Sequence, residues 1–360
     1  MHLPSPYKSI KKYLPATACV IATAVLATSA LTSCTEPLTY SGSKDDPYKN
    51  FDQLALIVKQ RYCFFKQKEI DWDAVTAKSR AEITTETNPV ELFKIMSGML
   101  DSLHDGHVNL SAPFANSYYK KWWSDYPQDF NERTLQEYYL KFGGYQKGGM
   151  TYAVFLPDTV GYVRIPSFST QLSPTTLDYV LAALGSTVGM IIDIRDNGGG
   201  YLTNVPEVVG RFISEKITGG YIRHKTGPGP EEFSKPFKVE YEPAEKGRIQ
   251  YLDRPIILLT NRSCFSAAND FTAVMKTLPN VTIVGARTGG GGGMPFSSEL
   301  PNGWGIRFSA CPINDADDRI TEFGIDPDIE VHCTPQELAA GKDAILNYAL
   351  DIFRPEEEQF

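Results

Sequence analysis

The chain has 360 residues, of which 42% are hydrophobic, 22% charged and 12% aromatic, and this composition excludes a mostly disordered protein. Its formal charge of −8 argues against a nucleic-acid partner, because binding to phosphates needs a basic face. The 29 glycines and 24 prolines predict many loops but exclude a collagen-like repeat.

The N-terminal segment has the pattern of an export signal. Three lysines precede an uncharged stretch, residues 13–33, that is rich in Ala, Val, Thr and Leu. This stretch ends in the sequence LTSC, which resembles a bacterial lipobox and implies cleavage before Cys34 and acylation of its thiol. An uncleaved membrane helix is the alternative, since the stretch is about 20 residues long. We therefore expect a signal peptide at residues 1–33, a lipid anchor on Cys34 that tethers the chain to a bacterial membrane, and a location in the cell envelope.

The next segments are predicted to be a linker and a helical domain. Residues 34–50 are rich in Pro, Ser, Gly, Lys and Asp, which is typical of a solvated spacer. In residues 51–110 apolar side chains recur at intervals of three and four, which predicts a helical N-terminal domain. Residues 111–150 are rich in Tyr and Trp and form a connection, either irregular structure over the main domain or a wall or lid that faces a substrate.

From residue 151 to 360, strand-like and helix-like segments alternate. Residues 188–194 and 255–260 are continuous apolar runs of the buried-strand kind, and residues 266–278 and 335–353 are helix-like. Such alternation predicts an α/β layered sheet in one core domain.

The cysteines do not indicate a metal site. Apart from the N-terminal segment, the cysteines are widely spaced, with no CxxC pair and no zinc-ligand spacing: Cys63, Cys264, Cys311 and Cys333. We expect no metal and no cofactor.

Three loops contain residues with catalytic potential. His104 and His107 lie where the helical segment ends, and a histidine there can be structural, a general base or part of a metal site. Residues 198–200 are three glycines after a buried strand, whose backbone N–H groups can form an oxyanion hole. Ser266 lies at a turn from a strand to a helix, where it is either a nucleophile or an ordinary N-cap.

Six motifs occur in an order that resembles the C-terminal processing (tail-specific) and tricorn-core serine peptidase family. They are LHDGHVNL, GYVRIPSFS, IIDIRDNGGG, ILLTNRSCFSAAND, IVGARTGGGG and EFGIDPDIEV, within residues 51–332. The resemblance implies a Clp-protease/crotonase-like spiral α/β core behind the helical domain. It also implies that Ser266 is the nucleophile, His107 the base and Glu322 the acid, with Glu322 acting on the imidazole directly or through a neighbouring polar residue. The oxyanion hole implied by the family is formed by the N–H of Ala267 and a glycine N–H, from Gly199 or Gly200.

The sequence also departs from the family pattern. Glycine occupies the position of the lysine that the tail-specific branch uses as base, within residues 287–293. Only 53 residues separate His107 from Gly161, which is too few for a PDZ domain. In addition, Asn269 replaces a common glutamate, and the run of glycines at 289–293 is either a simple loop or space for an extended substrate.

These observations predict a lipid-anchored serine endopeptidase that hydrolyses unfolded or partly processed polypeptides. A non-catalytic protein that binds peptides or small hydrophobic ligands is the alternative, because the same fold occurs in a retinoid-binding protein of the eye. A zinc hydrolase built on His104 and His107 is a third hypothesis.

Overall fold

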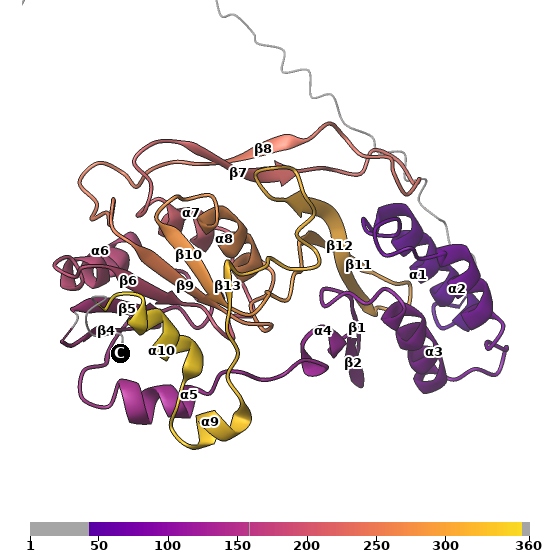
Figure 1. The fold of residues 1–360 in the computed structure, drawn as a ribbon. Helices are drawn as coiled ribbons and strands as arrows, with labels where there is room; N and C mark the ends of the chain where they lie inside the picture. The colour runs from indigo at the N-terminus through magenta and orange to yellow at the C-terminus, as the bar shows by residue number, and fades with distance from the viewer. Residues whose placement is uncertain (1–42, 158, 355–360) are drawn as a thin grey trace, which may run out of the picture. The chain divides into compact units, whose positions relative to one another are not determined.

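The computed structural model describes residues 43–157 and 159–354, and residues from Ser43 onward form one compact unit (Figure 1). The expected signal peptide, Cys34 and the first part of the expected linker lie outside the described residues. None of the helices in the described ranges has the length and apolar character needed to cross a membrane.

The first described segment is helical, as its apolar periodicity predicts. Its three helices are α1 (Pro47–Arg61), α2 (Trp72–Arg80) and α3 (Pro89–Asp101). Side chains cap each start: Asn88, for example, accepts from the first turn of α3 while Glu91 bonds back to the Asn88 N–H, which forms a capping box. The first helix begins four residues before the expected boundary, because Asp46 caps it and Pro47 favours the first turn.

The three helices share their hydrophobic core with a six-stranded sheet. Buried Phe51 and Leu54 of α1 belong to the same cluster as Trp304 and Phe308, which come from the other end of the chain. The sheet has the order β2-β1-β12-β7-β8, with β11 paired to β12. Its strands are β1 (Asn109–Ala112), β2 (Ala115–Tyr118), β7 (Ile217–Ile222), β8 (Phe237–Tyr241), β11 (Gly293–Glu299) and β12 (Gly305–Asn314).

The second sheet has seven strands in the order β13-β10-β9-β6-β5-β4-β3. Five of them, from β13 to β5, are parallel, and β3, β4 and β5 pair antiparallel. The strands are β3 (Tyr145–Lys147), β4 (Met150–Phe155), β5 (Val160–Arg164), β6 (Met190–Asp193), β9 (Ile256–Thr260), β10 (Val281–Gly285) and β13 (Ile329–Glu330). Strands β6 and β9 are buried at every residue, which explains their continuous apolar sequences.

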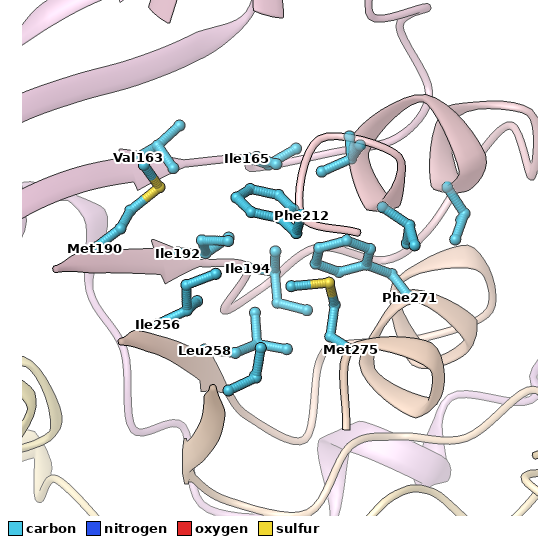
Figure 2. Packing of buried hydrophobic residues seen from close by; sticks show 14 of the residues in the cluster. Val163, Ile165, Met190, Ile192, Ile194, Phe212, Ile256, Leu258, Phe271 and Met275 are labelled. Atoms are coloured by element: carbon cyan, nitrogen blue, oxygen red, sulfur yellow. The ribbon is translucent and has the colours of Figure 1, made fainter. Parts of the chain in front are cut away.

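Helices cover both faces of the seven-stranded sheet. Ile192 and Leu258 point to one face and pack in one cluster with Phe271 of α8, as Figure 2 shows. Their neighbours in sequence, including Ile191, point to the other face and pack in a cluster with Leu346 of α10. The expected α/β class is therefore confirmed as a layered sheet between helices (Figure 1).

The remaining helices have ten residues or fewer. These helices are α4 (Lys121–Ser124), α5 (Glu132–Thr134), the π-helix η1 (Leu135–Tyr139), α6 (Pro174–Ala183), α7 (Asn204–Val209), α8 (Ala267–Met275), α9 (Pro335–Ala339) and α10 (Ala344–Asp351).

Two segments differ from the pattern that the sequence predicts. The helix expected at 335–353 is divided into α9 and α10, because Gly341 has a φ of +80° and Asp343 caps a new helix. The connection 111–150 contains two short helices and the π-helix as well as strands, so it is more regular than its sequence indicates.

Candidate active site

Ser266 lies in the turn that joins buried strand β9 to helix α8. Its backbone has φ of +57° and ψ of −119°, and its side chain caps no helix N–H. Ser266 therefore occupies the N-cap position of α8 without capping the helix through its side chain. A left-handed conformation is strained for a residue with a Cβ, and it is maintained here by a hydrogen bond from the Ser266 N–H to the Gly290 oxygen (2.9 Å).

His107 approaches Ser266 from a separate segment, the turn between α3 and β1. The Asp105 carboxylate accepts the His107 backbone N–H at 2.7 Å and fixes this turn. The imidazole Nε2 lies 3.0 Å from the Ser266 Oγ, although the two residues are 159 positions apart in the sequence. The structure thus brings the predicted nucleophile and the predicted base into hydrogen-bond contact.

The rest of the imidazole is enclosed. Its Nδ1 lies 3.4 Å from the Oγ of Ser309 on β12, and its ring lies against Phe265, with 4.8 Å between the ring centroids. Only 3% of His107 is exposed, and this burial lowers its pKa from 6.5 to about 4 despite the opposing charge of Asp105. The imidazole is consequently neutral at pH 7 and can accept a proton.

Glu322 does not contact His107 in the described structure. Its Oε1 accepts a hydrogen bond from Lys68 Nζ at 2.7 Å, and both side chains are at least 92% buried. The same ammonium donates to the backbone oxygens of Leu103 (3.2 Å) and His104 (3.1 Å), which precede His107. Of the two roles that the sequence left open for Glu322, the geometry favours the indirect one, in which Lys68 connects the carboxylate to the histidine loop.

Burial also changes the protonation of Glu322. It raises the pKa of this carboxyl to about 8, with a further contribution from the negative charge of Asp105. The ion pair with Lys68 opposes this rise. Glu322 therefore holds a proton more tightly than an ordinary glutamate, and its Oε2 has no hydrogen-bond partner among the described residues.

Residues 198–200, called the glycine loop below, lie against the turn that contains Ser266. Gly199 has φ of +90°, and a Cβ on it would lie 2.5 Å from the Phe265 oxygen and 2.9 Å from the Ala267 nitrogen. Only glycine permits this approach. The Gly199 N–H, however, donates to the Asn197 side chain at 2.9 Å, so an oxyanion would compete with Asn197 for it. Gly200 is next in the loop, with φ of +143°.

Asn197 is a structural residue that the sequence analysis did not identify. Its side-chain amide also donates to the Ile165 oxygen, and its backbone oxygen accepts the N–H of Phe265, each at 3.0 Å. Asn197 therefore joins the glycine loop to the residue that follows β5 and to the Ser266 turn. In the sequence, the role of Asn197 is indicated only by its place directly before the three glycines of the DNGGG segment.

Lys68, Asp105 and Ser309 are further residues of the site that the sequence analysis missed. Asp105 adjoins His107 in a His-Asp-Gly-His sequence that is typical of an Asx turn, so a signal existed. Lys68 and Ser309 have no local signal, because each reaches the site from a distant part of the chain.

Asn269, which replaces the common glutamate, has a positioning role. Its amide group donates to the Thr321 oxygen at 3.1 Å and accepts from the Thr288 hydroxyl at 2.6 Å. It thus attaches α8 to the glycine-rich loop and to the segment that contains Glu322.

A cavity of about 720 Å³ lies next to the loops that carry His107 and Ser266. Gly106 and Phe265, the sequence neighbours of His107 and Ser266, form part of its wall. Trp122 of α4 stacks on Phe265 with 4.1 Å between the ring centroids. The aromatic connection therefore contributes part of the wall of this cavity.

The geometry of the histidines does not resemble a zinc site. His104 stacks with Tyr119, with 5.2 Å between ring centroids, whereas His107 contacts Ser266. In the part of the chain that the structure describes, no three His, Cys, Asp or Glu side chains are grouped as a metal site.

Comparison with known proteins agrees with this geometry. Residues 159–331 match peptidase family S41, and residues 43–101 match the tricorn protease C1 domain. A solved structure from Parabacteroides merdae, assigned as a peptidase, is 42% identical, with 86% of this chain and 98% of that chain covered and a TM-score of 0.82. The chain belongs to peptidase family S41.

Members of family S41 with established names are more distant relatives. Tricorn protease of Thermoplasma acidophilum is 26% identical over 196 residues, which cover 54% of this chain and 16% of that protein. Carboxy-terminal processing protease CtpA of Bacillus subtilis is 26% identical over 182 residues, which cover 50% of this chain and 36% of that protein. The chain thus spans a minor part of the length of these curated relatives. Mature CPAF shares the fold, with a TM-score of 0.63 at 12% identity over 86% of this chain and 96% of that chain.

Proposed function

We propose that the chain is a serine endopeptidase in which Ser266 is the nucleophile and His107 the general base. The observation that carries this proposal is the 3.0 Å contact between the His107 Nε2 and the Ser266 Oγ. In this mechanism the hydroxyl gives its proton to Nε2 as Oγ attacks a peptide carbonyl, and the imidazolium then donates that proton to the leaving amine. The acyl-enzyme is hydrolysed by the same steps with water as the nucleophile.

The oxyanion is bound in this mechanism by backbone N–H groups. Ala267 is the first residue of α8, so its N–H has no acceptor within the helix and lies at the positive end of the helix dipole. A glycine N–H from Gly199 or Gly200 provides the second donor. Each such donor is typically worth about 3–4 kcal/mol in the transition state.

Glu322 acts at a distance in this proposal. Through Lys68 it holds the backbone of Leu103 and His104, and so the approach of His107 to Ser266. It is therefore a positioning residue, while the Ser309 hydroxyl contacts Nδ1 at 3.4 Å.

The substrate and the location are the most general part of the proposal. The proposed substrates are unfolded or partly processed polypeptides, because the relatives of this chain include a protease named for carboxy-terminal processing. The lipobox-like sequence at Cys34 supports a lipid anchor and a place in the cell envelope. A Cys34→Ser variant is expected to move from the membrane fraction to the soluble fraction, and a chain that stays in the membrane would contradict the anchor.

The catalytic assignment is tested with a fluorophosphonate probe and an unfolded casein substrate. Ser266→Ala is expected to abolish labelling and to lower kcat by on the order of 10⁴–10⁶, and His107→Gln to slow both reactions severely. Ser263→Ala removes a neighbouring serine of the same turn and provides the matched control, with near-parental activity.

The outcome also separates the enzyme from its alternative. If the parent chain neither reacts with the probe nor cleaves casein, the peptidase proposal fails and a non-catalytic binding protein is favoured. Labelling that survives in Ser266→Ala would overturn the choice of nucleophile.

A further inference from the structure

The cavity beside the catalytic loops has more basic than acidic groups in its wall. Its lining contains four Lys or Arg side chains and two acidic ones: Lys68, Lys121, Arg262, Arg287, Asp125 and Glu322. Lys68 is paired with Glu322 at 2.7 Å, and Arg287 with Asp326 at 2.8 Å. In the described ranges, no ion pair involves the other two cations, Lys121 and Arg262.

Arg262 is the more informative of these two cations, because it is half-buried. Its Nε donates to the Trp122 oxygen at 2.6 Å and its Nη1 to the Thr288 oxygen at 3.1 Å. Its guanidinium also lies over the Tyr126 ring, 3.9 Å from the centroid. All of these partners are neutral, so Arg262 is oriented into the cavity wall without a counter-ion among the described residues.

The electrostatics of Arg262 agree with an anion site. Burial, with a contribution from the nearby charge of Arg287, lowers its pKa. A partly buried cation without a counter-ion is unfavourable, and a bound carboxylate would relieve this. The planar guanidinium can donate two parallel hydrogen bonds to a carboxylate, which gives both affinity and orientation.

The position of the cavity connects it to the reaction. Phe265 in its wall is bonded to Ser266, and Gly106 to His107. The cavity thus adjoins the residues on either side of the proposed catalytic pair, within reach of substrate side chains close to the scissile bond.

We propose that the cavity binds a carboxylate of the polypeptide substrate and that Arg262 selects it, an inference that rests on the proposed peptidase function. Because an endopeptidase cleaves within a chain, this carboxylate is an Asp or Glu side chain close to the scissile bond. Asp125 in the wall opposes its binding.

The test compares matched peptides on the full-length chain. One arm exchanges Glu for Gln at each position within three residues of the cleaved bond, and the other exchanges a free C-terminus for an amide. In the first arm we expect kcat/KM to be about 10–100-fold higher for the Glu peptide, the range of a charge-assisted hydrogen bond, and added salt is expected to reduce this ratio. In the second arm we expect a ratio near 1, and a preference confined to the free C-terminus would overturn the proposal.

Variants assign the selectivity to Arg262. Arg262→Gln is expected to bring the ratio to about 1, Arg262→Lys to retain part of it, and Asp125→Asn to increase it. Arg319→Gln is the matched control, because it removes the same charge from an exposed arginine that is paired with Asp315, and it is expected to leave the ratio unchanged. Thermal unfolding checks that each variant is folded, and a ratio of two substrates is insensitive to a general loss of activity.

A binding measurement separates failure of this proposal from failure of the proposed function. Fluorescence anisotropy of the same labelled peptides is measured on Ser266→Ala and on Ser266→Ala/Arg262→Gln. Binding selective for the carboxylate that requires Arg262 supports the site even if the parent chain proves unable to cleave. Equal binding of charged and neutral peptides, or selectivity that persists without Arg262, overturns it.

Discussion

The two residues of the proposed catalytic pair are held in different ways. Ser266 is positioned locally, by one strand, one turn and the first residue of α8, with the glycine loop against it. His107 is positioned by contacts from across the chain: Lys68 after α1, Ser309 on β12 and Glu322 near the end of the second sheet. The nucleophile region is thus fixed by backbone geometry, and the base region by buried side-chain charges and hydrogen bonds.

This difference has an energetic consequence. A backbone turn is stable once its strand and helix are packed, whereas a buried ion pair depends on both partners being present. Changes to the buried ion pair behind His107 should therefore act mainly on stability, and changes to the glycine loop beside Ser266 mainly on catalysis. The following experiments test that separation.

Removal of one member of the buried ion pair should cause the largest loss of stability. At pH 9, above the raised pKa of Glu322, the variant Glu322→Leu leaves the Lys68 ammonium buried without a carboxylate, and we expect the free energy of unfolding to fall by about 3–5 kcal/mol in urea titrations. The double variant Lys68→Met/Glu322→Leu should recover part of this loss, because it leaves no unpaired charge.

An exposed pair provides the control for this experiment. Lys59 and Asp73 lie 2.7 Å apart with exposed side chains, and Lys59→Met should change the free energy of unfolding by less than about 1 kcal/mol. Equal effects of the buried and exposed variants would show that burial of the Lys68 pair is unimportant.

A methyl group on the glycine loop should affect catalysis instead. Gly199→Ala places a Cβ in contact with the Phe265 oxygen at a positive φ, so the loop must move away from Ser266. We expect kcat to fall by about 10²–10³, the cost of losing one oxyanion donor. Gly98→Ala on α3 is the matched control, since a Cβ there meets nothing within 4 Å, and its kcat should stay at the parental value. Parental activity in Gly199→Ala would remove this loop from the oxyanion hole.

The buried imidazole should make stability depend on pH. Because the pKa of His107 is lowered from 6.5 to about 4, the unfolded chain binds the proton more readily. The contribution of His107 to stability is therefore complete above pH 6.5 and is lost as the pH falls toward 4, by on the order of 3 kcal/mol.

A neutral substitute isolates this effect from other titrating groups. His107→Gln should lack it, so the difference in unfolding free energy between parent and variant should shrink as the pH is lowered from 7 to 4. A difference that stays constant over this range would contradict the lowered pKa.

The smallest effect is expected at Ser309. Its hydroxyl is 3.4 Å from the His107 Nδ1, a long contact, so Ser309→Ala should lower kcat by about 10-fold or less. Ser297→Ala on neighbouring β11 should change kcat by less than about 2-fold, because this serine is exposed. A 10³-fold loss in Ser309→Ala would instead make Ser309 an essential partner of the base.

The same contrast explains which parts of the structure the sequence predicts. The α/β order and the turn at Ser266 follow from nearby residues, since an apolar run and a helix start are local patterns. The sequence does not reveal the break between α9 and α10, because residues on both sides of the turn at Gly341 follow a helical pattern. The pairing of Lys68 with Glu322, 254 positions apart, has no sequence signal and depends on the folded chain.

One feature of the fold links the glycine loop to a late part of the chain. Arg195, which precedes that loop, is fully buried and pairs with Asp193 at 2.7 Å and with Asp343 at 2.8 Å. Asp343 in turn caps α10, a helix that is synthesised after Ser266 and His107. A nascent chain that already contains both of these residues therefore still lacks one of the two carboxylates that pair with the buried guanidinium beside the glycine loop.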